Sequence, residues 1–167
     1  GLLVGSFEPS AKPIDVDALP EGFSFDLLEE DWDHFEPVMN EAMHRIPALH
    51  DAEVRMLLNG PESFTLDGAF LMGEAPEIKG FFMCCGMNSM GIASSGGAGK
   101  ALADWVVDGD PGVDLSSVDV RRFARIRDSL NAVRDRAVEN LSAHYAIGFP
   151  GRELASAREL RLSPLHD

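Results

Sequence analysis

Gly86-Met-Asn-Ser-Met-Gly-Ile-Ala-Ser-Ser-Gly-Gly-Ala-Gly-Lys100 follows directly on the apolar run Gly80-Phe-Phe-Met-Cys-Cys. The apolar run predicts a short strand buried on both faces. The small residues from Gly91 to Val107 predict a helix that ends at Gly109. Glycine disfavours a helix by about 1 kcal/mol relative to alanine, so several glycines here indicate close approach of a backbone or a ligand.

The start of this predicted helix is suited to an anionic group. A helix N-terminus offers unpaired N–H groups and the positive end of the helix dipole. The N1/C2=O edge of a reduced flavin ring is one such group. A tightly packed strand, turn and helix without a ligand explains the same residues equally well, so both interpretations stay open.

Two phosphate-binding motifs can be excluded. The string ending in Gly99-Lys100 resembles a P-loop, but Ser94 stands where the first glycine is required and Ala101 replaces the Ser or Thr that holds magnesium. No intact G-x-G-x-x-G is present either. These residues therefore do not bind the adenosine end of a dinucleotide in the usual way.

Composition and charge set the class of protein. The chain has 167 residues, 45% of them hydrophobic, which suits one ordinary domain or two small units. Its formal net charge of −14 argues against a nucleic-acid or anionic-membrane surface. Residues 1–110 hold 20 of the 28 acidic residues and 5 of the 14 basic ones. This shift predicts a boundary near Gly109-Asp-Pro-Gly112.

The remaining patterns predict two further helices and several strands. Hydrophobic residues spaced by three and four predict helices at 31–46 and 119–141. Acidic residues at 29–31 suit the start of the first helix, and Pro47 should end it. The strand candidates are residues 1–8, residues 53–58, and a hairpin of 63–68 with 69–73 around Asp67-Gly68.

Cysteine and histidine indicate neither a disulfide framework nor a metal site. Cys84 and Cys85 are adjacent, so on a strand they point to opposite faces, and buried thiols in a reducing compartment are the expected state. A vicinal redox pair is the minor alternative. The five histidines have no metal-ligand spacing, so no metal is expected.

Several motifs together resemble the sarcosine and dimethylglycine dehydrogenases, flavoproteins of the D-amino-acid-oxidase-like superfamily. The resemblance covers essentially the whole chain. Its strongest parts are Asn59-Gly-Pro-Glu-Ser-Phe-Thr-Leu-Asp-Gly68, Met72-Gly-Glu-Ala-Pro76, Gly86-Met-Asn-Ser-Met-Gly91 and Gly96-Gly-Ala-Gly-Lys-Ala-Leu-Ala-Asp-Trp105. Asp119-Val-Arg-Arg-Phe123, His144-Tyr145 and Ser163-Pro-Leu-His166 are similar to the segment that follows the flavin domain in that family.

The resemblance implies an α+β fold and an incomplete FAD-dependent oxidoreductase domain. Residues 1–72 would form part of the antiparallel substrate-side sheet with one helix. Residues 73–110 would form the flavin-facing strand, turn and helix, and residues 111–167 a helix and linker. An N-terminal dinucleotide-binding half and a C-terminal aminomethyltransferase-like domain would lie outside this chain.

The resemblance also implies site residues. The flavin-contacting turn of the family matches Met87, Asn88, Ser89, Met90, Gly91 and Ile92, acting through backbone amides more than side chains. Two positions depart from relatives. Phe7 stands where dimethylglycine-type enzymes place a tyrosine, and Ala93 where monomeric sarcosine oxidases have a lysine. No catalytic residue is assigned, although Phe7 is a candidate to face the substrate.

The implied function is oxidation of an N-methylglycine-type secondary or tertiary amine, sarcosine or dimethylglycine, by hydride transfer to FAD. The released one-carbon unit would leave as formaldehyde or pass to tetrahydrofolate in the further domain. No signal peptide or apolar span is recognisable, so we expect a cytoplasmic protein, or a mitochondrial-matrix one in a eukaryote. The isolated chain is expected to be inactive.

A second resemblance supports a non-catalytic alternative. Ser6-Phe-Glu-Pro, Lys12-Pro-Ile14 and Glu30-Asp-Trp-Asp-His-Phe-Glu-Pro37 are similar to the regulatory subunit of pyruvate dehydrogenase phosphatase. That resemblance implies a flavin-fold regulatory subunit without turnover.

Overall fold

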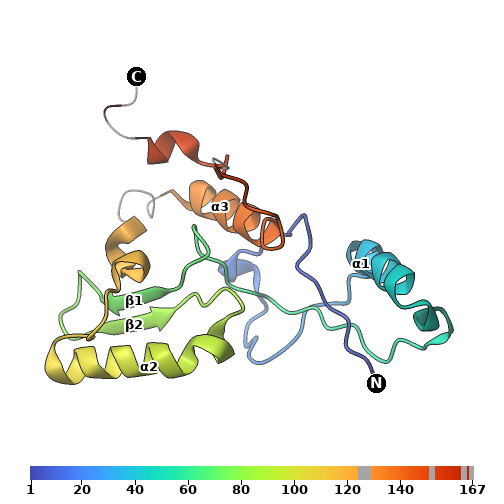
Figure 1. Cartoon of the computed structure of the whole chain (residues 1–167), viewed down its shortest axis with the longest axis horizontal. Helices are drawn as coiled ribbons and strands as arrows, with labels where there is room; N and C mark the ends of the chain where they lie inside the picture. Colours follow the sequence, from blue (N-terminus) through green and yellow to red (C-terminus); the bar gives the residue numbers. More distant parts are fainter. Residues whose placement is uncertain (124–128, 151–152, 163–164, 166–167) are drawn as a thin grey trace. The chain divides into compact units, whose positions relative to one another are not determined.

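The computed structural model describes residues 1–123, 129–150, 153–162 and 165. By its internal contacts the chain divides into two compact units, Gly1–Pro61 and Glu62–Asp167. Figure 1 shows the elements of each unit in chain order. No helix in the described part of the chain is long and apolar enough to cross a membrane.

The first unit contains the predicted helix at 31–46, which is confirmed as α1 (Trp32–Arg45). Asp31 caps it, because its Oδ1 accepts a hydrogen bond from the backbone N–H of His34 at 3.0 Å. A hydrogen bond from Lys12 is the main reason why the pKa of Asp31 lies below its ordinary value. Pro47 follows the helix end and opens the short 3-10 helix η2 (Pro47–Asp51), so the predicted stop is also confirmed. A shorter 3-10 turn, η1 (Val16–Ala18), precedes α1.

The two strands predicted in this unit are wrong. Residues 1–8 and 53–58 form no strand, and Leu3 is 86% exposed. A strand forms when its backbone N–H and C=O groups pair with a neighbour. Within the described residues of this unit no such neighbour lies beside either segment.

The second unit is built on two antiparallel strands, β1 (Leu71–Glu74) and β2 (Phe82–Cys85). Leu71 pairs with Cys85 and Glu74 with Phe82. The predicted hairpin of 63–68 with 69–73 is therefore wrong, because the partner of β1 is β2. The predicted strand at 80–86 is confirmed as β2, although its faces are only half-buried and Cys85 is exposed.

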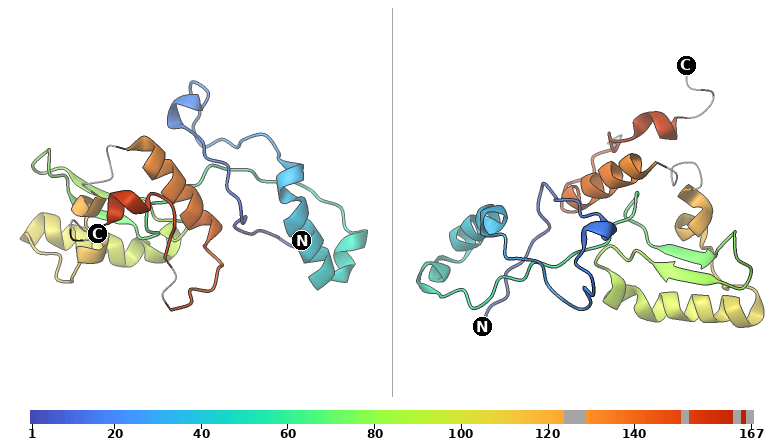
Figure 2. Two further views of the ribbon diagram at one scale, coloured as in Figure 1. Left: turned by 90° about the horizontal axis from the view of Figure 1, so that it is seen from above. Right: turned by 180° about the vertical axis from the view of Figure 1, so that it is seen from behind.

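The predicted glycine-rich helix is confirmed as α2 (Gly91–Asp108), which packs against the strand pair (Figures 1 and 2). The Trp105 ring lies edge-to-face with Phe82 at 5.8 Å between centroids. A Cβ at Gly73 would lie 3.2 Å from the same indole, so the missing side chain lets α2 approach β1. Gly109 ends the helix in the left-handed conformation, with φ +78°. Lys100 lies inside α2 and pairs with Asp104, as expected if the glycines around it are not a phosphate loop.

The last segment is less helical at its start than predicted. Two 3-10 turns, η3 (Ser116–Val118) and η4 (Val120–Phe123), precede α3 (Leu130–Ser142), and η5 (Arg158–Arg161) follows it. A single helix over 119–141 is therefore wrong. The α-helix begins only after Ser129, whose extended backbone and Oγ acceptor cap it. Residues 124–128 of that prediction lie outside the described residues.

Two hydrophobic clusters hold the second unit together. The first joins the strands, α2 and η3 around the fully buried Met72, with Ala98, Ala101 and Val118. The second joins Leu66 to Ala132 on α3. Among the described residues, the helices and the antiparallel pair agree with the expected α+β class.

Candidate functional site

The turn from Gly86 to Gly91 leads from β2 into α2 in an unusual backbone conformation. Gly86, Asn88 and Ser89 have φ values of +66°, +49° and +63°. Two consecutive non-glycine residues in the left-handed region are rare, and asparagine tolerates it better than most. The Met90 N–H donates to the Met87 carbonyl at 2.8 Å, which closes the turn directly before the helix.

The start of α2 is open. It has no side-chain cap and no acidic residue in its first turn. Among the described residues, the backbone N–H groups of Gly91, Ile92 and Ala93 donate no backbone hydrogen bond outside the helix itself. Ile92 is 97% exposed. The positive end of the α2 dipole is therefore available to an anion or a polar ring edge.

The predicted site residues divide into two groups within this turn. The side chains of Met87, Asn88 and Ser89 are turned toward the protein: Met87 packs against the first cluster, Asn88 is 4% exposed, and the Ser89 hydroxyl donates to Glu62 at 2.5 Å. Met90 and Ile92 are exposed. The turn therefore exposes backbone amides and apolar side chains.

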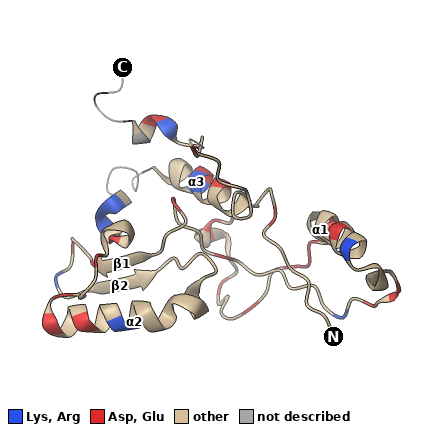
Figure 3. Ribbon diagram, in the orientation of Figure 1, with Lys and Arg blue, Asp and Glu red and all other residues tan. Residues whose placement is uncertain are grey.

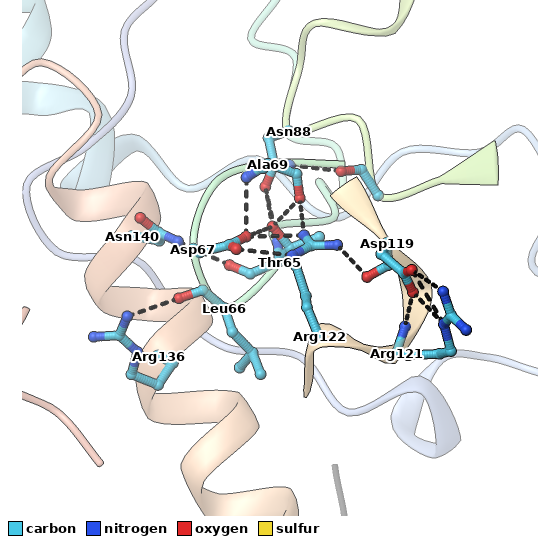
Figure 4. Close-up of polar contacts among 11 residues, drawn as sticks. Thr65, Leu66, Asp67, Ala69, Asn88, Asp119, Arg121, Arg122, Arg136 and Asn140 are labelled. Atoms are coloured by element: carbon cyan, nitrogen blue, oxygen red, sulfur yellow. Dashed lines mark hydrogen bonds and ion pairs between the residues drawn. The ribbon is translucent and has the colours of Figure 1, made fainter. Parts of the chain in front are cut away.

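Asn88 is fixed by Thr65, a residue 23 positions earlier (Figure 4). The Asn88 Oδ1 accepts from the Thr65 backbone N–H at 2.8 Å and from its hydroxyl at 3.3 Å. The Asn88 Nδ2 donates to the Gly86 carbonyl at 2.5 Å. Thr65 is itself buried, and its hydroxyl also reaches the Ala69 carbonyl at 2.8 Å. The turn is thereby tied to the loop before β1.

Arg122 of η4 forms hydrogen bonds to the same loop, at Asp67 and Ala69. Its guanidinium donates to both oxygens of Asp67, at 2.9 and 3.0 Å, and to the Ala69 carbonyl at 2.7 Å. Partial burial acts to raise the pKa of Asp67, but hydrogen bonds from Arg122 and from the Ala69 N–H hold that pKa below its ordinary value. Asp67 is thus a carboxylate at neutral pH.

Helix α3 holds the other side of the loop. The Arg136 Nη2 donates to the Leu66 carbonyl at 2.9 Å, and the Asn140 Nδ2 to the Thr65 carbonyl at 3.0 Å. Arg136 is only 4% exposed. Figure 4 shows these donors converging on residues 65–69 from η4 and α3.

Sequence reasoning found the turn but missed the residues that hold it. Thr65 and Asp67 lie in the Asn59–Gly68 motif and Arg122 in the Asp119–Phe123 motif, but neither motif, nor the turn signal at Asp67-Gly68, indicated that these side chains hold the turn. Asn140 lies in none of the quoted motifs. The excess of arginine after residue 110 was a weak sequence signal for these contacts, and Figure 3 shows basic positions on η4 and α3.

The two residues at which the chain departs from relatives lie in different units. Phe7 is half-buried in the extended start of the first unit, and Ala93 is exposed in the first turn of α2. The two thiols remain free; burial raises the pKa of Cys84, and Cys85 is exposed. Any substrate-facing role of Phe7 stays a prediction.

Two family models match the chain. The model described as FAD dependent oxidoreductase matches residues 1–105, and the FAD dependent oxidoreductase central domain matches residues 108–163. The chain therefore belongs to the FAD-dependent oxidoreductase family.

Curated relatives align over nearly the whole chain. It is 41% identical to mouse sarcosine dehydrogenase, mitochondrial, over 99% of the chain. It is 41% identical to the formaldehyde-forming 4-methylaminobutanoate oxidase of Paenarthrobacter nicotinovorans, also over 99%. It is 40% identical to the mouse pyruvate dehydrogenase phosphatase regulatory subunit, mitochondrial, over 100%. The predicted resemblance is confirmed, and the chain spans 18–20% of the length of these relatives.

Proposed function

We propose that this chain supplies the ring-binding part of a longer FAD-dependent enzyme that oxidises an N-methylated amino acid. The observation that carries the proposal is the open start of α2 in a chain of this family. Met87 to Ile92 would contact the flavin, chiefly through backbone amides. A dinucleotide-binding half outside this chain would hold the adenosine end.

The residues present fit the edge of a flavin ring. Among the described residues, the N–H groups of Gly91, Ile92 and Ala93 donate no backbone hydrogen bond outside the helix itself, and no acidic side chain stands in the first turn of α2 to repel negative charge. A Cβ at Gly96, Gly97 or Gly99 would meet nothing within 4 Å, so a planar ring or a further strand has room beside the helix.

The bound cofactor would supply the two-electron oxidation, accepting a hydride from the N-methyl carbon. The contribution of this chain is electrostatic and geometric. The amides at the α2 start would stabilise negative charge on the reduced ring, because a helix N-terminus favours anions. Met90 and Ile92 would exclude water from the ring with their exposed apolar side chains.

The substrate class follows from the names of the relatives. Sarcosine and 4-methylaminobutanoate are both secondary N-methyl amines that carry a carboxylate. Sarcosine and dimethylglycine are the substrates we propose first, and 4-methylaminobutanoate is the natural third compound to test. Phe7, which has no hydroxyl, would offer the substrate an apolar contact.

An anaerobic titration of the full-length protein tests the proposal. We expect a visible flavin spectrum that bleaches on addition of one of the three amines, with a smaller response to the matched primary amines glycine and 4-aminobutanoate. A flavin spectrum unchanged by any N-methyl amine would contradict the enzyme. A full-length protein without FAD would contradict the ring-binding role as well.

The regulatory alternative has one specific observation in its favour, the 40% identity to the phosphatase regulatory subunit over the whole chain. In that case the protein would keep the same fold, with or without FAD at this turn, and would not oxidise an amine. Full-length protein that alters pyruvate dehydrogenase phosphatase activity, and whose flavin no amine reduces, would favour this alternative.

Further domains and the compartment also belong to the proposal. We propose that the released one-carbon unit leaves as formaldehyde or passes to tetrahydrofolate in an aminomethyltransferase-like domain outside this chain. Product analysis with and without tetrahydrofolate separates the two fates. The two mouse relatives carry the word mitochondrial in their names, which supports the mitochondrial matrix in a eukaryote and can be checked by cell fractionation.

A further inference from the structure

We propose that Thr65 and Asn88 are positioning residues for the flavin ring: together they set the direction of the amides at the start of α2. This inference rests on the proposed function. The side chains of Thr65 and Asn88 do not face the ring, but they determine how strongly the amides stabilise the reduced ring.

Thr65 contacts two residues of the turn. Its N–H and hydroxyl bind Asn88, and its methyl carbon lies against Gly86, where a Cβ would come within 2.7 Å. Asn88 in turn donates to the Gly86 carbonyl. The two side chains therefore fix Gly86 and Asn88, and the turn leads directly into Met90 and Gly91.

The turn requires such support because its conformation is costly. A non-glycine residue in the left-handed region costs roughly 1–2 kcal/mol, and Asn88 and Ser89 occupy it in succession. Strained backbone of this kind persists where surrounding contacts over-determine it. Without the hydrogen bonds to Thr65, Asn88 would relax, and the amides of Gly91 to Ala93 would turn with it.

Thr65 is immobilised from outside the turn. Its hydroxyl and the Arg122 guanidinium share the Ala69 carbonyl, and Asn140 holds the Thr65 carbonyl. Arg122 and Asn140 lie within the part of the chain that matches the central-domain model. That segment thus reaches the ring-binding turn through Thr65 without any contact of its own to the ring.

Two substitutions in the full-length protein each remove part of the support. Thr65→Val keeps the shape of the side chain and the backbone N–H that binds Asn88, and removes the hydroxyl. Asn88→Gly accepts the left-handed backbone without strain and removes all three side-chain hydrogen bonds. Thr65→Ser retains the hydroxyl, and Gly80→Ala lowers stability at a glycine whose Cβ would contact nothing.

The readout is the midpoint potential of bound FAD. We expect both Thr65→Val and Asn88→Gly to weaken binding of the reduced form relative to the oxidised form about tenfold. For a two-electron couple this makes the potential about 30 mV more negative. Thr65→Ser and Gly80→Ala should match the unmodified protein. Hydrogen exchange of the 86–93 peptide should be faster in the first two variants only.

The outcomes separate this inference from the function on which it rests. Unmodified protein that holds no FAD would overturn both. FAD with an unchanged potential in Thr65→Val and Asn88→Gly would overturn the positioning role alone. A shift in Gly80→Ala as large as that in Thr65→Val would do the same, because it would reveal a general effect of stability. Thr65→Val preserves side-chain volume and keeps the test in place if Asn88→Gly does not fold.

Discussion

Gly86 lies where β2 turns toward α2, and it has two independent reasons to be glycine. Its φ is +66°, and a Cβ there would lie 2.7 Å from the Thr65 methyl carbon. We expect Gly86→Ala to lower the free energy of unfolding by about 2–3 kcal/mol, since both the backbone and the contact are violated. Urea unfolding followed by circular dichroism measures the loss.

Gly80 provides the matched control. It has a similar φ of +79° with nothing within 4 Å of a Cβ. Gly80→Ala should therefore show only the backbone cost, about 1 kcal/mol. Adding Thr65→Ser to Gly86→Ala should recover part of the loss by removing the methyl carbon. Equal losses at the two glycines would contradict the close contact with Thr65.

The stability of the second unit should depend on pH through Asp67. Because its pKa is lower in the folded protein than its ordinary value, the stabilisation is fully present above that ordinary value. It is lost as the pH falls through the lower, folded pKa. The wild-type stability should thus decline as the pH falls to the ordinary pKa of an aspartate and below it, as measured by urea unfolding at a series of pH values.

Asp67→Asn tests which group is responsible. The variant should be less stable than the wild type at neutral pH, because Arg122 has lost its charged partner. Its stability should fall less steeply with acid, because the carboxyl group that titrates has been removed. Asp119 and Glu139 also have lowered pKa values, Asp119 chiefly through the hydrogen bond from Arg121. A residual slope is expected from them. An unchanged slope in Asp67→Asn would contradict the contribution of Asp67.

At the scale of elements, the cap of α3 sets where that helix begins. The Ser129 Oγ accepts from the Ala132 N–H, and the helix then carries Arg136 and Asn140 to the 65–69 loop. We expect Ser129→Ala to reduce the free energy of unfolding by about 1 kcal/mol. Thermal unfolding measures it, and Ser129→Asp, which keeps an acceptor, should stay close to wild type. Equal losses in the two variants would point away from capping.

The helices α1 and α2 were predictable from the sequence because their signals are local, whereas the single helix predicted over 119–141 was wrong. The period of three and four, Asp31 as cap and Pro47 as stop lie within one stretch, and α2 likewise has its own glycine stop. Strands depended on partners. Leu71–Glu74 pairs with Phe82–Cys85 and not with the preceding segment, in which the Thr65 hydroxyl binds the Ala69 carbonyl.

The site was predictable only in its local part. The turn at 86–91 is recognisable from its own residues, whereas its support comes from far away in the sequence. Thr65 lies 23 residues before Asn88, and Arg122 lies 55 residues after Asp67. A buried hydrogen bond over such separations has no periodicity, so no pattern in a single sequence predicts it.

At the scale of the whole molecule, the two units differ in how much they bury. In the described part of the first unit the buried hydrophobic residue is Leu57, while Leu3, Val16 and Phe25 are each more than 80% exposed. The second unit contains both hydrophobic clusters.

We therefore expect the 167-residue chain by itself to bind FAD weakly or not at all. It offers the ring a turn but has no G-x-G-x-x-G for the adenosine end. Titration of the isolated chain with FAD, followed by flavin fluorescence, measures the affinity, with the full-length protein as control. A stoichiometric yellow complex of the isolated chain would contradict this expectation.

The backbone bridge between Met72 and Asp119 has a consequence for how this protein can be recombined with its relatives. The two family models meet between residues 105 and 108, which invites a crossover there. Such a crossover would take β1 and Asp67 from one parent and the strand-like partner Asp119 and Arg122 from the other. Chimaeras should take residues 62–142 from a single parent. The junction between two family models can fall inside a stretch of chain that folds as one unit.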